Sequence, residues 1–275
     1  MDPWDLMQQW ALVIPPSRPS AVQLARIKLH IREIDRSQPV AILGSTPEFR
    51  DLLFESGFRE IHVLERNSTF FYAVSALRVY QNQEEVISGD WLDTLPSLSE
   101  KFAIILSDLT SGNIPYESRT RFYQLIANAL SPGGLFLDKI LTHTGSHIPL
   151  NQIEAKYSEL PLNLVHINHF SCEALFCSEL LDIGSVVDST LFYTILDDRL
   201  KDPRTRVFAK LAQRITPPGF KWWYGRRWNE LSRGYCENLT RLSVEEDEPL
   251  SPYCGRLKHF AFIKPHPARA KSNAL

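Results

Sequence analysis

The chain has 275 residues, a formal net charge of −2 and a sequence pI of about 6.5, with 44% hydrophobic and 23% charged residues. That composition indicates a folded globular protein of one large domain, or of one domain with a cap. The absence of a basic surplus argues against nucleic acid as a partner, and no apolar stretch is long enough to cross a bilayer. The first residues lack a signal-peptide pattern and the four cysteines fit no CxxC zinc spacing, so we expect a cytoplasmic protein with reduced thiols.

The first 37 residues precede the first predicted strand. A short apolar piece ends in a proline-rich stretch at 15–20, because the residue before a proline is disfavoured in a helix. Residues 21–34 predict a helix, since apolar side chains recur along one side. We expect these pieces to pack beside the first strand or to lie over a ligand site.

The stretch from Val40 to Glu65 has a sequence pattern that can form a ligand-binding turn. An apolar run ends at Gly44, a helix follows at once with Thr46 able to cap it and Pro47 in its first turn, and a second apolar run ends at Glu65. Glycine lets a ligand approach the backbone, and an acid about 20 residues later can accept hydrogen bonds from ribose hydroxyls. The alternative interpretation is an ordinary strand–helix–strand unit with an exposed glutamate.

Strands and helices continue to alternate as far as residue 141. Apolar runs at 86–88, 102–106 and 135–141 predict three further strands. This alternation favours a parallel, doubly wound sheet, in which ligands bind at the carboxyl ends of the strands. We therefore expect a site formed by the residues at four consecutive strand ends: Gly44, Glu65, Asp90 and Asp108.

The pattern changes after residue 141. Four segments predict helices, namely 149–160, 170–183, 186–200 and 203–215. An aromatic-rich stretch follows, and two final segments predict an antiparallel strand pair at the sheet edge, 239–244 and 256–264. The expected organisation is an N-terminal helical segment (1–37), a ligand-binding core (38–141), a helical cap inserted for substrate (142–235), the final strands (236–265) and a flexible tail (266–275).

This order of elements resembles the class I S-adenosylmethionine-dependent methyltransferases over about residues 38–141 and 239–264. The resemblance implies a Rossmann-like, mostly parallel seven-stranded sheet with a C-terminal antiparallel strand pair and a helical insertion. It implies S-adenosylmethionine as cofactor, with Glu65 holding the ribose and Asp90 contacting the adenine amino group. The chain departs from the family in its first turn, where Ser45 and Thr46 follow Gly44 in place of further glycines. The cofactor-binding residues implied by the resemblance are Gly44, Ser45, Thr46, Glu65, Arg66, Asp90, Trp91, Asp108 and Leu109.

The chemistry of such a donor requires few catalytic groups. Its sulfonium already makes the methyl group electrophilic, so the protein must mainly hold a nucleophile in line with it. His143 is the candidate base because it follows the fifth strand, and the alternative is an ordinary loop histidine. Tyr116, Trp222 and Tyr224 are candidate substrate contacts, because aromatic faces suit planar or cationic groups, and the alternative is packing of the cap onto the core. No metal site is predicted.

The sequence therefore predicts an S-adenosylmethionine-dependent methyltransferase acting on a small organic molecule, with transfer to oxygen, nitrogen or carbon left open. Relatives that methylate nucleic acid bases carry an Asn/Asp-Pro-Pro-Tyr motif after the fourth strand, and this chain has Asp108-Leu109-Thr110-Ser111 there. One alternative is a methyltransferase-like binding or scaffold protein without catalysis. Another is a nicotinamide oxidoreductase, against which the absence of a GxGxxG turn counts.

Overall fold

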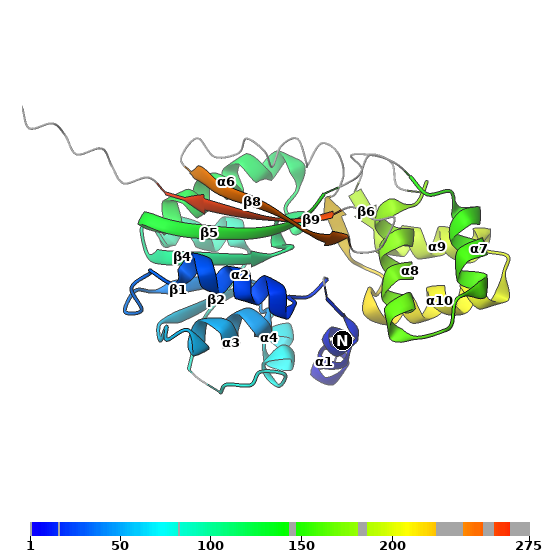
Figure 1. Ribbon diagram of the computed structural model, residues 1–275, viewed down its shortest axis with the longest axis horizontal. Helices are drawn as coiled ribbons and strands as arrows, with labels where there is room; N and C mark the ends of the chain where they lie inside the picture. Colours follow the sequence, from blue (N-terminus) through cyan, green and yellow to red (C-terminus); the bar gives the residue numbers. More distant parts are fainter. Residues whose placement is uncertain are drawn as a thin grey trace, which may run out of the picture.

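A computed structural model describes residues 2–15, 17–81, 83–142, 147–180, 186–223, 239–249 and 256–264. Its centre is a seven-stranded sheet with the order β3-β2-β1-β4-β5-β9-β8 (Figure 1). The strands of this sheet are β1 (Val40–Leu43), β2 (Ile61–Glu65), β3 (Glu85–Ser88), β4 (Phe102–Asp108), β5 (Leu130–Thr142), β8 (Thr240–Pro249) and β9 (Arg256–Ile263).

The pairing of the strands confirms the predicted fold class. Strands β1 to β5 pair in parallel, and β9 pairs antiparallel with both β5 and β8. The strand order reverses between β1 and β4, which are neighbours although β2 and β3 lie between them in the sequence. Loops leaving these two strands therefore run in opposite directions, and the crevice between them is where open α/β sheets bind ligands.

Helices cover both faces of the sheet, which explains the continuously apolar strands. The two faces of β1 illustrate this, because Ile42 packs with α2 and α3 while Leu43 packs in the cluster that contains α6. The helices of this part of the chain are α1 (Pro3–Leu12), α2 (Ala21–Ile31), α3 (Pro47–Glu55), α4 (Ser68–Ser75), α5 (Trp91–Thr94) and α6 (Arg119–Ala129), with 3-10 turns at η1 (Leu95–Ser97), η2 (Thr110–Asn113) and η3 (Tyr116–Ser118).

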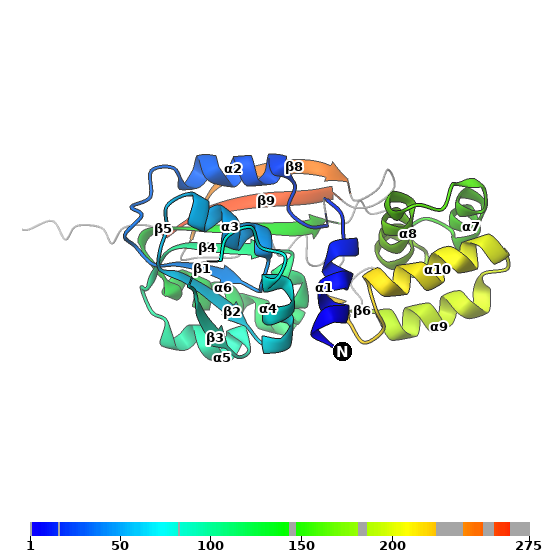
Figure 2. The same ribbon diagram turned by 90° about the horizontal axis from the view of Figure 1, so that it is seen from below.

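A group of helices between β5 and β8 lies at one end of the sheet (Figures 1 and 2). Its elements are α7 (Leu150–Glu159), α8 (Leu164–Cys177), β6 (Val186–Asp188), α9 (Ser189–Arg199), α10 (Pro203–Ile215) and β7 (Lys221–Trp223). The predicted helix at 203–215 is confirmed, with Asp202 accepting a hydrogen bond from the Thr205 N–H as its cap. The bounds predicted for α8 were wrong because Asn163 caps it earlier, and the predicted helix from residue 186 begins instead as β6, which pairs with β7.

Of the two cysteines that the structure describes, one differs from expectation. Cys172 on α8 is a buried free thiol, and burial raises its pKa to about 12. Cys177, at the end of the same helix, is disulfide-bonded, so the prediction of reduced thiols was wrong there. The sequence could not show this, because a disulfide depends on the approach of two Cα atoms to within about 7 Å.

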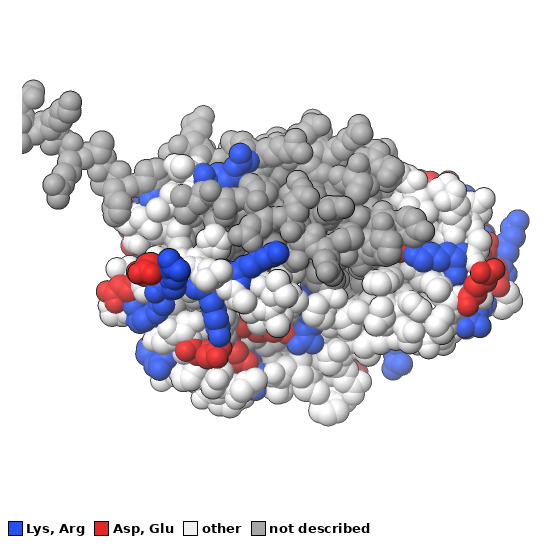
Figure 3. Space-filling model, viewed as in Figure 1, with Lys and Arg blue, Asp and Glu red and all other residues white. Residues whose placement is uncertain are grey.

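The surface and the helices carry two further observations. In the view of Figure 3, the Lys and Arg side chains of the described residues lie among Asp and Glu side chains and form no continuous basic surface. Within the described ranges, no helix has the length and apolar character needed to span a lipid bilayer.

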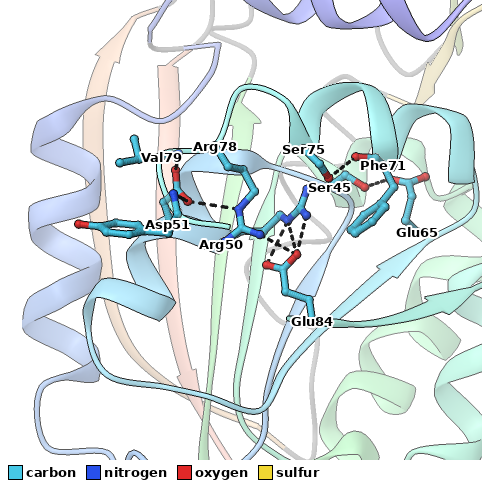
Figure 4. A network of polar contacts seen from close by, with 10 residues as sticks. Ser45, Arg50, Asp51, Glu65, Phe71, Ser75, Arg78, Val79 and Glu84 are labelled. Atoms are coloured by element: carbon cyan, nitrogen blue, oxygen red, sulfur yellow. Dashed lines mark hydrogen bonds and ion pairs between the residues drawn. The ribbon is translucent and has the colours of Figure 1, made fainter. Parts of the chain in front are cut away.

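A buried polar network connects α3, the helix that follows the turn after β1, to a neighbouring segment of the chain (Figure 4). Arg50 of α3 and Arg78 of the α4–β3 connection both contact the carboxylate of Glu84, and all three side chains are almost completely buried. Asp51 of α3 contacts Arg78 and accepts a hydrogen bond from the Val79 N–H. The network therefore joins α3 to the segment that leads into β3, on the sheet face opposite α6.

Candidate active site

The turn after β1 has the geometry that the sequence predicted for a close approach to a ligand. Gly44 has a φ of +86°, a conformation that favours glycine, and its N–H donates to the Leu64 carbonyl. A Cβ built on Gly44 would meet nothing nearer than Thr110 Oγ1, at 4.0 Å. Thr46 occupies the N-cap position of α3, but its side chain makes no capping hydrogen bond. The turn therefore presents an open backbone surface beside a helix start.

The Glu65 carboxylate at the end of β2 is held firmly in place. Ser45 Oγ donates to one of its oxygens at 2.9 Å, and the Asn67 N–H donates to the other at 2.7 Å. Burial raises the pKa of Glu65, while these two hydrogen bonds act in the opposite direction. Each carboxylate oxygen keeps a lone pair, so the group can still accept hydrogen bonds from a ligand. Ser45, predicted as a cofactor contact, here orients Glu65.

The start of α5 brings Asp90 next to Glu65. Gly89, which precedes it, donates its N–H to the Glu65 carbonyl, and Asp90 caps α5 by accepting from the Leu92 N–H. Arg66 lies 3.7 Å from Asp90 between charged atoms and is mostly exposed. The Trp91 indole N–H donates to the Leu64 carbonyl at 2.8 Å, which fixes the ring. Thus Asp90 and Trp91 lie along the edge that the sequence predicted for the donor.

Asp108, at the end of β4, has different surroundings from the other predicted residues. Its carboxylate forms a buried ion pair with Lys139 of β5, whose ammonium lies 3.5 Å from the Gln23 amide oxygen of α2. The Asp108 side chain is therefore directed to the α2 face of the sheet and is already neutralised. Leu109, the next residue, has a φ of +58°, and its N–H donates to the Lys139 carbonyl.

A second polar cluster lies on the opposite face of β4 and β5. Asp138 is completely buried there and accepts hydrogen bonds from Tyr123 Oη and Ser111 Oγ, both at 3.1 Å. Burial raises the pKa of Asp138 to about 6, although the nearby hydroxyl groups of Ser107, Tyr123 and Ser111 act against the shift. None of these residues was predicted as part of a site.

The raised pKa gives the stability of the protein a predictable dependence on pH. Asp138 has an ordinary value of 3.8 in the unfolded chain and about 6 in the folded chain, so only the folded chain holds this proton between those values. We expect the free energy of unfolding of the parent, measured relative to Asp138→Asn, to fall by about 3 kcal/mol as the pH rises from below 4 to above 6. Urea unfolding of both proteins at a series of pH values measures this difference. A difference that does not change with pH would contradict the assignment.

Trp222 of β7 reaches the carboxyl end of β4. Its ring contacts Phe176 of α8, with centroids 5.6 Å apart, and stacks on Phe220 at 5.4 Å. A Cβ built on Gly112 in η2 would lie 3.9 Å from Trp222 Cδ1. The insertion therefore places an aromatic wall beside the loop that follows β4.

Tyr116 lies near this wall. The guanidinium of Arg119 stands 4.9 Å from the centre of its ring and donates hydrogen bonds to the Ile114 and Trp223 carbonyls. Arg119 thus links the start of α6 to β7. Tyr224 and His143, the remaining predicted substrate and catalytic residues, lie outside the described residues.

Helix α1 and the residues that follow it extend over the core side of the crevice. Trp10 packs edge-on against Phe70 of α4, with ring centroids 6.0 Å apart. Arg18 donates through Nε to Glu48 of α3 at 2.7 Å. Phe70 lies in the first turn of α4 and Glu48 in the first turn of α3, and both helices begin at the carboxyl edge of the sheet. The N-terminal segment therefore covers that edge.

The same segment also contacts the insertion. Gln9 of α1 donates to the Ile215 carbonyl at the end of α10, and Asn168 of α8 donates to the Leu12 carbonyl. Figure 2 shows α1 between the sheet and the helices of the insertion. The N-terminal segment therefore bridges the core and the insertion.

Comparisons with known proteins identify the fold. No family model and no curated protein matches the sequence. Among solved structures, the N-methyltransferase NodS from Bradyrhizobium japonicum has a TM-score of 0.52 at 9% identity, covering 97% of this chain and 100% of its own. A methyltransferase from Methanosarcina mazei has a TM-score of 0.51 at 10% identity, covering 91% and 100%. The chain has the class I methyltransferase fold.

A third solved structure carries a different description. It comes from Rhodobacter sphaeroides, is described as a candidate zinc-dependent alcohol dehydrogenase, and has a TM-score of 0.58 at 15% identity, covering 95% of this chain and 97% of its own. At that identity it shows the fold alone. Among the described residues, no group of three or more His, Cys, Asp or Glu side chains is placed to hold a metal ion.

Proposed function

We propose that the chain is a methyltransferase that transfers a methyl group from S-adenosylmethionine to a small organic acceptor. The observation that carries this proposal is the Glu65 carboxylate, held by Ser45 and Asn67 beside the open turn at Gly44. This pair lies at the carboxyl edge of a class I methyltransferase fold, beside the reversal of strand order. The solved NodS structure of the same fold contains S-adenosylhomocysteine.

The residues present fit the donor. Gly44 gives room for its close approach, and Glu65 can accept hydrogen bonds from both ribose hydroxyls. Asp90 is proposed to accept from the adenine amino group; its cap of α5 and the hydrogen bond that fixes the neighbouring Trp91 ring support this role. Arg66, Thr46 and Leu109 stay proposed contacts of the same site.

Asp108 is proposed to act indirectly, through the ion pair that anchors the end of β4. The donor supplies an electrophilic methyl group, and the chain's own residues would orient the acceptor and exclude water. Trp222 and Tyr116 form the proposed acceptor wall, and a flat or cationic group suits their faces. Alignment alone can supply about 7 kcal/mol or more of the barrier, so a base is not obligatory. His143 remains the proposed base for acceptors that must lose a proton.

Replacing Glu65 by glutamine should weaken the binding of S-adenosylhomocysteine by about 1.5–3 kcal/mol, because charge-assisted hydrogen bonds to the ribose are lost. Calorimetric titration of the purified proteins measures this change. Glu33→Gln is the matched control, since the Glu33 side chain is 84% exposed and lies on the surface. Equal affinity of the Glu65 variant and the parent, or no binding by the parent, would overturn the proposal.

One observation favours a second candidate, a methyltransferase-like binding or scaffold protein. Among the described strand-end acids, Glu65 is held by two donors, Asp90 accepts from the Leu92 N–H as a helix cap and Asp108 is paired with Lys139, so none of the three is poised as a base. A chain that binds S-adenosylmethionine but forms no S-adenosylhomocysteine with a panel of amines, phenols and carboxylic acids would favour this candidate. Product formation with any of them would exclude it.

A further inference from the structure

The loop that follows β4 is held by three separate anchors. The Leu109 N–H donates to the Lys139 carbonyl at 2.9 Å, and Thr110 Oγ1 donates to the Leu43 carbonyl at 3.1 Å. Ser111 Oγ donates to the Asp138 carboxylate at 3.1 Å. Leu109 has left-handed backbone angles that are unfavourable for a leucine, so this loop needs its anchors to keep its conformation.

This loop connects the two halves of the proposed site. Its Thr110 side chain is the nearest group to the open side of Gly44, and its Gly112 lies against Trp222. A shift of the loop would therefore change the surroundings of both Gly44, in the proposed donor site, and Trp222, in the proposed acceptor wall. Of the three anchors, only the one at Ser111 ends on a titratable group.

The side chains around Asp138 are polar but buried from solvent. Tyr123 and Arg119 of α6 face it from one side, Ser107 of β4 from a second and Ser111 of the loop from a third. All of these side chains are at most 3% exposed. Ionising a carboxyl group in such a buried position costs free energy. The neighbouring residues of β5 are apolar, so the packing of the strand does not by itself require a carboxyl group at this position. A group kept at a stability cost points to a role in function.

We propose that Asp138 is a positioning residue, which holds the loop 109–113 against the Gly44 turn through its hydrogen bond with Ser111. As a carboxylate it accepts from Tyr123 and Ser111 at the same time. Once protonated, it must use one oxygen as a donor, and the charge-assisted character of both bonds is lost. Because its pKa is raised to about 6, the loop should be held firmly above that pH and loosened below it.

Hydrogen exchange tests the positioning role without reference to catalysis. At pH 7.5, the Leu109 and Gly112 amides should exchange about tenfold faster in Asp138→Asn than in the parent, because a charge-assisted hydrogen bond is lost. Ser111→Ala should give the same increase, since it removes the link to the loop and leaves Asp138 in place. Glu33→Gln should leave both rates unchanged. Unchanged rates in Asp138→Asn and Ser111→Ala would overturn the proposal.

The consequence for ligand binding rests on the proposed function. The dissociation constant of S-adenosylhomocysteine should rise about tenfold in the parent between pH 7.5 and pH 5.5, with a smaller rise in Ser111→Ala and Asp138→Asn. Glu65 titrates in all three proteins, so its contribution cancels in the comparison. The same pH dependence in all three would refute the positioning role, whereas a parent that binds nothing at any pH would refute the proposed function and leave hydrogen exchange to decide the loop.

Discussion

Replacing Glu84 by glutamine is expected to lower the free energy of unfolding by about 3–5 kcal/mol, because it breaks a buried network of charged side chains. The Glu84 carboxylate accepts from Arg50 Nε at 2.9 Å and Nη2 at 2.5 Å, and it lies 2.9 Å from Arg78 Nη1 (Figure 4). Glutamine has nearly the same shape but no charge. Two guanidinium groups would then stay buried without the Glu84 charge, and Asp51, which contacts Arg78, would be a remaining counter-charge among the described residues.

The burial of this network makes the effect large. The side chains of Arg50, Arg78 and Glu84 are each at most 3% exposed, and desolvation lowers the pKa of Arg50. The Arg50 guanidinium also lies 4.3 Å from the centre of the Phe71 ring, so it cannot turn toward water without breaking that contact. Because these residues join α3 to the segment before β3, the loss should appear in the cooperative unfolding of the core.

Glu55→Gln is the matched control for this prediction. Glu55 also lies on α3 and pairs with Lys28 at 2.8 Å, but both side chains are about half exposed. Such a surface pair contributes about 0–1 kcal/mol. Urea unfolding at pH 7 compares the two variants with the parent. If Glu84→Gln lost no more stability than Glu55→Gln, the network would not have the energetic role assigned to it.

The topology of the core could be predicted because its signals are local. The apolar run that ends at Gly44 and the proline at position 47, in the first turn of the next helix, each mark a boundary within a few residues. Alternation of strands and helices then leaves few arrangements, since crossover connections are right-handed and neighbouring strands pair. The antiparallel strand pair at the sheet edge was predicted from the two final segments and is confirmed, with β9 lying between β5 and β8.

The candidate site could be predicted only to the level of strand ends. Glu65 and Asp90 lie close together because parallel strands bring their carboxyl ends to one edge. The roles of Ser45 and Asp108 were not accessible, because hydrogen-bond partners depend on side-chain direction across the sheet. Asp138 and Lys139 did leave a signal, since two charged residues inside an apolar strand are rarely buried without partners.

The second large effect concerns β5, in which successive side chains point to opposite faces of the sheet, so Lys139 and Asp138 lie on different faces. Lys139 forms an ion pair with Asp108, and the two side chains are 2% and 3% exposed. Replacing Lys139 by methionine would preserve the aliphatic stem and remove the ammonium. The Asp108 carboxylate would then be buried without its counter-charge, which should lower the free energy of unfolding by about 3–5 kcal/mol.

A double variant separates the cost of the stranded charge from the cost of repacking. Adding Asp108→Asn to Lys139→Met removes the uncompensated charge, so we expect urea unfolding to show recovery of most of the lost stability. If the double variant were as unstable as the single one, altered packing would explain the loss and the ion pair would not. The same double variant decides how Asp108 acts in the site. If it only anchors the end of β4, the recovered protein should bind S-adenosylhomocysteine nearly as the parent does, whereas a direct contact of Asp108 with the donor would leave binding weakened although stability had returned.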